Sequence, residues 1–185
     1  MRYRLNRHNA GFLVLDQLAE QHAISIGQTL FDADIGKGKI AGSAVLLAQP
    51  QTFMNLSGVA INRLTDYFRI ALEDVIVVHD DLDLPFQTIR LKVGGGHGGH
   101  KGLISIIDHL GSADFTRVRI GIGRPSHKSL VESYVLSPFS DDEMRFLPQV
   151  TRTAAEAVTD IVSSGIQTAM EKHHVKDNST LIKEG

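Results

Sequence analysis

The sequence predicts a single α/β domain, and three observations support that fold class. The chain has 185 residues, of which 42% are hydrophobic, and this suits one well-buried core better than two. Segments with the apolar periodicity of helices alternate with short runs rich in β-branched residues. No internal repeat or long linker interrupts the alternation, so residues 1–185 are expected to form one domain.

The first half of the chain is expected to contain two helices separated by a β-hairpin. Asn9 is a suitable cap for the first helix, because apolar residues recur at helical spacing directly after it. The stretch Gly36-Lys37-Gly38 is typical of a turn between two strands. The expected elements are a helix at 9–22, strands at 30–35 and 40–48, and a helix at 56–68.

The second half begins with a strand that is expected to be buried on both faces. Residues 75–78 read Val-Ile-Val-Val, and the run ends in His79-Asp80-Asp81. In the C-terminal third, Pro148 is expected to weaken or kink a helix that starts near Asp141, and a further helix follows Gly165. The other expected elements are strands at 88–93 and 116–122, a helix at 101–110, and a loose tail at 176–185.

Composition excludes several classes of protein. The absence of cysteine rules out a disulfide framework, a thiolate zinc site and a cysteine nucleophile, and it is compatible with a reducing cytosol. The N-terminus lacks the apolar core of a signal peptide, and no apolar run approaches the ~18 residues of a membrane span. The chain is therefore expected to be cytoplasmic and to have no membrane partner.

Charge is unevenly distributed along a chain whose net charge is only −2. Residues 87–128 contain seven lysines and arginines, two aspartates and four histidines, which gives this stretch a local charge of +5. Such a stretch fits an anionic ligand that binds at one place. A solvated basic face without a ligand is an equally good interpretation of charge alone.

Residues 94–102, GGGHGGHKG, form a glycine-rich loop between an expected strand and an expected helix. The spacing of Gly94, Gly96 and Gly99 matches a dinucleotide-binding fingerprint, but the next strand ends in IGIGRP, without the required acid. A phosphate-binding Walker loop also fails, because no Gly-Lys-Ser/Thr sequence ends the segment. No nucleotide cofactor is therefore expected.

A metal site in the same loop is a weaker alternative. His97 and His100 could be ligands together with acids at 80, 81 and 83, but they lack the rigid helical spacing of zinc sites. No metal is expected. The loop then serves as a mobile backbone segment beside a site, or as a close backbone approach to a ligand.

Three other polar residues stand at positions that favour chemistry. Asp80 ends a buried strand, which is where open α/β sheets bind their ligands. His8 precedes the first helix, and Asn55 lies on a loop before the second. A histidine oriented by a carboxylate is a general base near neutral pH. Plain helix capping by Asn9 and Ser57, with His8 as a surface residue, is the alternative.

Five segments, in this order and spacing, resemble the bacterial peptidyl-tRNA hydrolase family. They read RHNAGF from residue 7, QPQTFMNLSG from 49, VVHDDLDLP from 77, LKVGGGHGGHKGL from 91 and FTRVRIGIGRP from 115. The resemblance implies one domain with a twisted mixed β-sheet flanked by helices. It also implies a monomer that hydrolyses the ester between peptide and tRNA, with peptidyl-tRNA as its partner and without a cofactor.

The resemblance also implies roles for individual residues. His8 would be the base that activates water, and Asp80 would orient it. Tyr3, Met54, Asn55, His100 and Lys101 match substrate-binding positions, with Asn55 holding the substrate or the water and Met54 lining the peptide channel. Lys92 and Arg119 match the clamp on the 5′ phosphate of tRNA. The glycines of the loop would let its backbone move and admit a bulky peptidyl ester.

The chain departs from the family pattern at two places. Lys101 stands where members usually have asparagine, and a lysine cannot accept a hydrogen bond. Members also begin with an apolar strand and a Gly-Asn-Pro-Gly turn before the tyrosine that matches Tyr3, whereas this chain begins at Met1, inside that region. The first strand of the sheet is therefore expected to be missing, and activity to be reduced. A non-catalytic RNA-binding relative and a nucleotide-dependent oxidoreductase are the alternative functions.

Overall fold

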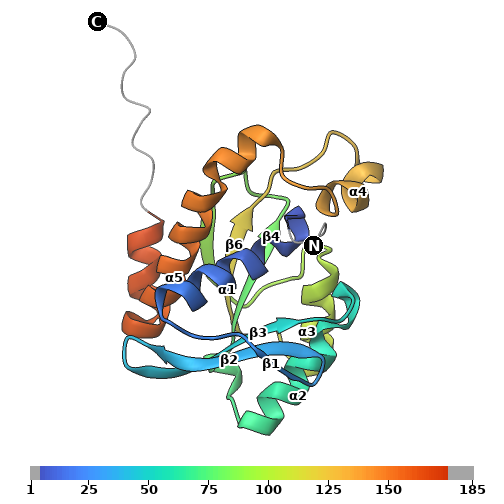
Figure 1. Cartoon of the computed structure of the whole chain (residues 1–185). Helices are drawn as coiled ribbons and strands as arrows, with labels where there is room; N and C mark the ends of the chain where they lie inside the picture. Colours follow the sequence, from blue (N-terminus) through green and yellow to red (C-terminus); the bar gives the residue numbers. More distant parts are fainter. Residues whose placement is uncertain (1–4, 175–185) are drawn as a thin grey trace, which may run out of the picture.

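The computed structural model describes residues 5–174 of the chain, in one α/β domain (Figure 1). Tyr3 and the tail expected at 176–185 lie outside the described residues. None of the helices in the described part is long and apolar enough to cross a membrane.

Two three-stranded sheets form the framework, in place of the single mixed sheet that was expected. The first sheet is antiparallel, in the order β1-β2-β3, and the second is mixed, in the order β4-β6-β5. In the second sheet β6 pairs parallel with β4 and antiparallel with β5. The strands are β1 (Gln28–Leu30), β2 (Ala33–Ile40), β3 (Ser43–Pro50), β4 (Ile76–Asp81), β5 (Ile89–Val93) and β6 (Thr116–Gly121).

The expected single sheet is interrupted between β3 and β4. No strand within residues 5–174 pairs with the free edge of either one. Side chains of both strands instead border a partly open cavity of about 660 Å³, together with apolar residues of the neighbouring helices. The hydrogen bonds of each sheet therefore stop at this cavity, and helix packing joins the two sheets.

The structure has two hairpins where the sequence predicted one: the predicted strand at 30–35 is interrupted by a turn at Phe31-Asp32, between β1 and β2, and a second hairpin joins β2 to β3. β2 runs without a break through Gly36 and Gly38, and the turn lies at Ala41-Gly42, where both residues have positive φ. Two-residue hairpin turns require this conformation. The glycines belong to the strand because Ile24 packs against them; a Cβ on Gly36 would lie 2.9 Å from the Ile24 side chain. These glycines mark a close contact, not the expected turn.

Helices cover the two sides of the second sheet (Figure 1). α1 and α5 pack together on one side, where they form the main apolar core with β5 and β6. α2 and α3 pack against each other, and smaller apolar clusters join α2 to β2 and α3 to β4 and to Phe115, the residue before β6. The helices are α1 (Ala10–Gln21), α2 (Ser57–Phe68), α3 (Lys101–Leu110), α4 (Val131–Val135) and α5 (Asp141–His173), with 3₁₀ turns η1 (Arg7–Asn9), η2 (Met54–Leu56), η3 (Leu72–Asp74) and η4 (Lys128–Leu130).

Helix ends confirm some sequence predictions and correct others. α3 spans the predicted residues, and Ser140 with Glu143 forms a capping box at the start of α5. Asn9 occupies the N-cap position of α1 but makes no capping hydrogen bond, and Ser57 is the first residue of α2 instead of its cap. Backbone angles stay helical at Pro148, and the break in α5 is at Gly165, whose φ is 81°.

The start of α1 lies directly against the backbone of β4. A Cβ built on Gly11 would overlap the carbonyl oxygen of Val78. Only glycine allows this approach, which places η1, with His8 at its centre, beside the end of β4 that carries Asp80.

Replacing Gly11 with alanine is therefore expected to push α1 away from β4. The free energy of unfolding should fall by roughly 1–3 kcal/mol, the usual cost of overpacking, and the site described below should be disturbed as well. Urea unfolding is the measurement. Gly27→Ala is the matched control, because a Cβ at Gly27 meets only the Ser25 hydroxyl at 3.5 Å. Equal stability of the two variants would contradict this close packing.

Candidate active site

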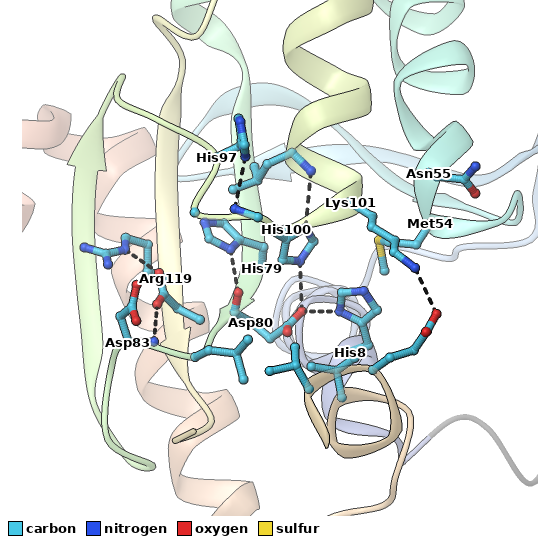
Figure 2. A pocket seen from close by; sticks show the side chains of 18 of the residues that line it. His8, Met54, Asn55, His79, Asp80, Asp83, His97, His100, Lys101 and Arg119 are labelled. Carbon is cyan, nitrogen blue, oxygen red and sulfur yellow. Dashed lines mark hydrogen bonds and ion pairs between the residues drawn. The ribbon is translucent and has the colours of Figure 1, made fainter. Parts of the chain in front are cut away.

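A cleft of about 730 Å³ opens beside the end of β4. Figure 2 shows side chains from separate parts of the sequence converging on it. Its lining includes the predicted residues His8, Met54, Asn55, Asp80, Lys92, His100, Lys101 and Arg119. The structure thus brings together every predicted site residue that it describes.

Asp80 is the centre of this cleft. Its Oδ1 lies 2.8 Å from Nδ1 of His8 and 3.0 Å from Nε2 of His100, so a single carboxylate oxygen accepts from both rings. Burial alone would raise the pKa of the Asp80 carboxyl, but the hydrogen bonds from His100 and His8 outweigh burial, and the pKa lies well below its usual range. Asp80 is therefore a buried anion at neutral pH.

His100 has both ring nitrogens occupied. It is the N-cap of α3, where its Nδ1 accepts from the backbone N–H groups of Gly102 at 3.1 Å and Leu103 at 3.2 Å. Because Nδ1 must present a lone pair to these donors, the ring proton is on Nε2 and points at Asp80. The sequence placed His100 only at the border of the cleft, whereas the structure places it on the carboxylate.

His8 has one ring nitrogen committed and one available. Nδ1 faces the Asp80 carboxylate and donates to it, so in the neutral ring Nε2 carries the lone pair. No hydrogen bond occupies Nε2 within the described part of the chain, and the side chain lines the cleft with 12% of its surface exposed. Asp80 thus orients the ring through Nδ1, and the other nitrogen, Nε2, is available to accept a proton.

His79 is a third histidine of the site, and no pattern in the sequence singles it out. It is buried, its Nδ1–H donates to the backbone carbonyl of Asp80 at 2.7 Å, and its ring meets His100 edge-on. Its Nε2 is buried without a hydrogen-bond partner. Burial and the neighbouring His100 lower the pKa of His79 to about 4, so this ring is neutral at pH 7.

A metal ion is one possible occupant of the cluster of His8, Asp80 and His100, whose ligand atoms all lie within 4.8 Å of one another. The hydrogen bonds of His100 argue against it. A metal on Nε2 would move the ring proton to Nδ1, where it would face the N–H groups of Gly102 and Leu103. His97 is not part of this cluster; its Nδ1 accepts from the N–H of Gly99.

Arg117 organises the glycine-rich loop and, like His79, is not singled out by the sequence. Its guanidinium is buried and donates to the carbonyl oxygens of Gly95 at 2.6 Å and Gly96 at 2.7 Å. Gly94, Gly95, Gly98 and Gly99 have positive φ. The glycines are thus required by the shape of the loop, whereas the predicted movement of the loop remains a prediction.

The two predicted phosphate-binding cations lie on adjacent strands. Lys92 is register partner of Arg117, and Arg119 follows two residues later, so all three belong to one face of the sheet. Lys92 is exposed and has no ion-pair partner within residues 5–174. Arg119 is half-buried, and its Nε donates to Asp81 Oδ2 at 2.7 Å. Lys92 is therefore the more available cation.

Met54 and Asn55 approach from η2, before α2. A Cβ on Gly102 would lie 2.6 Å from the Met54 sulfur and 3.0 Å from the His100 ring, so Met54 packs closely beside His100. Asn55 is exposed, and Figure 2 shows it beyond Met54, away from the cluster around Asp80. Its amide makes no hydrogen bond within the described residues, which leaves it available to a ligand.

Lys101 pairs with Glu132, a residue that the sequence did not single out. Lys101 Nζ lies 2.9 Å from Glu132 Oε1, and Figure 2 shows the Lys101 side chain reaching toward the His8 side of the cleft. The hydrogen bond from Lys101 lowers the pKa of the Glu132 carboxyl. Both side chains line the cleft and are exposed.

Comparison with known proteins gives consistent matches over the whole chain. The family model described as peptidyl-tRNA hydrolase matches residues 1–180. The peptidyl-tRNA hydrolase of Geotalea daltonii is 44% identical over 95% of this chain and 92% of its own length, and that of Oceanobacillus iheyensis is 48% identical over 85% and 84%. The crystal structure of peptidyl-tRNA hydrolase from Acinetobacter baumannii superposes with a TM-score of 0.89 at 36% identity, over 94% of this chain and 89% of that one. The family match includes Met1 and gives no support to the expected loss of activity.

The lowered pKa of His79 predicts a specific acid sensitivity. A histidine that is neutral when folded but protonates at its ordinary pKa of 6.5 when unfolded contributes stability that is complete above pH 6.5 and is lost as the pH falls to about 4. The loss amounts to about 3 kcal/mol. The stability that Asp80 contributes is complete above its ordinary pKa of 3.8 and is lost only below it, outside this window.

Urea unfolding between pH 7 and 4.5 measures this effect. His79→Gln, which keeps a donor for the Asp80 carbonyl but does not titrate, should lose less stability over this range than the wild type. His97→Gln, at an exposed position, should follow the wild type. The interpretation fails if the free energies of unfolding of His79→Gln and the wild type decrease in parallel as the pH falls.

Proposed function

Because the chain belongs to the peptidyl-tRNA hydrolase family, it releases tRNA from peptidyl-tRNA, and we propose that His8 is the general base of this reaction. One observation carries the proposal: Asp80 accepts hydrogen bonds from both His8 and His100. This arrangement leaves His8 Nε2 as the nitrogen that is oriented, uncommitted and open to the cleft.

The other histidines of the cleft fit the role of base less well. His100 uses one nitrogen as a helix cap and the other as a donor to Asp80. His79 has a pKa of about 4 and is too weak a base at neutral pH. His97 is exposed and has no carboxylate partner within residues 5–174. A base near neutral pH needs both orientation and access, and His8 has both.

The proposed reaction is direct attack by water on the ester. His8 Nε2 takes a proton from water as the water oxygen bonds to the carbonyl carbon of the ester, giving a tetrahedral intermediate. The bond to the ribose oxygen then breaks, and that oxygen receives the proton from His8. Peptide and tRNA are the products. Asp80 stabilises the imidazolium that exists between these steps through a charge-assisted hydrogen bond.

No covalent nucleophile is required, because an ester has a better leaving group than an amide. Asn55 is the proposed donor to the developing oxyanion or holder of the water, since its amide is exposed and unpaired in the described structure. Met54, packed beside His100, is the proposed lining of the peptide path. Cytoplasmic location and a monomeric state remain predictions.

Lys92 and Arg119 are the proposed contacts to a tRNA phosphate. Their place on one face of adjacent strands, beside the cleft, supports this role. Charge-assisted hydrogen bonds to phosphate carry no sequence information, which suits an enzyme that accepts many tRNAs.

The proposed base is tested by replacing His8 with alanine. Turnover of peptidyl-tRNA should fall by roughly two or more orders of magnitude, the scale of a lost general base, and the melting temperature should change little. Asp80→Asn should reduce turnover less. His97→Ala, which removes another histidine of the same cleft, is the matched control. Near-normal turnover of the His8 variant would exclude this mechanism, and an inactive wild type would favour the non-catalytic RNA-binding alternative.

The phosphate contact is tested by Lys92→Ala. KM for peptidyl-tRNA should rise and its salt dependence should decrease, whereas a small ester substrate without the 5′ phosphate should be little affected. Arg119→Ala should act similarly, but it also leaves Asp81 without its ion pair, so Lys92 gives the cleaner result. Arg152→Ala removes an exposed cation that does not line the cleft and serves as the control. Equal losses on both substrates would assign Lys92 a structural role.

A further inference from the structure

The cleft has two walls that are joined at its floor and at its rim. One wall carries His8 and α4, and the other carries His100 and the start of α3. Asp80 joins them at the floor by its bonds to both histidines. The ion pair of Lys101 and Glu132, whose side chains are both exposed, joins them at the rim. Both residues of this second bridge line the same cleft as His8.

Lys101 stands where a positive charge is not favoured by its own helix. It is the first residue of α3, and the positive end of a helix dipole repels a cation in the first turn. Glu132 offsets this repulsion, and it is the one ion-pair partner of Lys101 in the described part of the chain. The side chain exposures of 60% for Lys101 and 73% for Glu132 make the pair weak and easily exchanged.

Glu132 is carried by a segment that is anchored to the opposite wall. The Tyr134 hydroxyl donates to the Ile122 carbonyl at 2.6 Å, and the Arg7 backbone N–H donates to the Ser137 carbonyl at 3.1 Å. The Arg7 guanidinium adds a hydrogen bond of 2.7 Å to the Ser137 hydroxyl. The segment that bears the carboxylate is therefore held beside η1, and the exchange of partners falls to the flexible side chain of Lys101.

We propose that Glu132 is an internal competitor that holds Lys101 until an anionic oxygen of the substrate replaces it. This inference rests on the proposed function. The substrate is a polyanion, and Lys101 lines the cleft beside the base, so a phosphate of the terminal nucleotide or a carboxylate of the peptide can take the place of Glu132. Lys101 then contributes to substrate binding, and Glu132 sets the affinity by opposing it.

A double-mutant cycle tests the competition. Glu132→Gln should lower KM for peptidyl-tRNA by about two- to five-fold, the range of an exposed ion pair, and Lys101→Gln should raise it. Glu132→Gln should change KM little when Lys101→Gln is already present, because Glu132 acts through Lys101. Asp142→Asn removes a carboxylate from an exposed ion pair on α5, outside the cleft, and controls for net charge.

Three substrates identify the anion. If Glu132→Gln lowers KM for a tRNA that carries a neutral peptide, the anion that replaces Glu132 is the phosphate. If it lowers KM only for tRNAs that carry acidic peptides, the anion is the peptide carboxylate. The inference is overturned if Glu132→Gln acts equally in both backgrounds, if KM rises or stays unchanged, or if a neutral ester without phosphate shows the same effect. Binding of deacylated tRNA to the same variants, followed by fluorescence anisotropy, tests the phosphate arm even if the proposed hydrolysis fails.

Discussion

A single carboxylate oxygen, Oδ1 of Asp80, organises the site by accepting hydrogen bonds from two histidines. A buried carboxylate without partners would be strongly unfavourable, and these two donors offset its desolvation. Each donor also fixes a ring: His100 through its second bonds to the start of α3, and His8 through its place on η1. Three elements distant in the sequence must therefore meet within hydrogen-bonding distance, and this requirement constrains the packing around them.

Glycines make that meeting possible. Gly11 lets α1 lie against the backbone of β4, and Gly102 leaves room for Met54 beside His100. Arg117 donates hydrogen bonds to the carbonyl groups of Gly95 and Gly96, and these bonds fix the backbone of the glycine-rich loop before His100. In the resulting cleft, the buried Asp80 carboxylate lies against His8, and lysine and arginine side chains line the walls. This distribution of charge suits a polyanionic substrate with a reactive ester at its end.

The sequence was sufficient for local features and insufficient for those created by packing. The positions of Asp80 near the end of β4 and of His8 before α1 could be predicted from neighbouring residues. The expected burial of this strand on both faces was wrong, because β4 lies at an edge of its sheet and its valines are only partly buried. The local pattern around Gly36 is that of a turn, and only the fold shows Ile24 packed against this glycine. Glu132 was missed because its partner lies 31 residues away, and no local pattern marks such a pair. The division into two sheets likewise depends on which edges pair, which hydrophobic periodicity does not encode.

The tautomers of His8 and His100 provide the most direct test of the central claim, that Asp80 orients both rings and leaves His8 Nε2 free. Nitrogen-15 NMR of histidine-labelled protein at pH 8 distinguishes a protonated from an unprotonated ring nitrogen. The hydrogen bonds require a proton on Nδ1 of His8 and on Nε2 of His100, and Asp80→Asn should disturb both assignments. A proton on Nε2 of His8, or on Nδ1 of His100, would contradict the proposed role of His8 as the base.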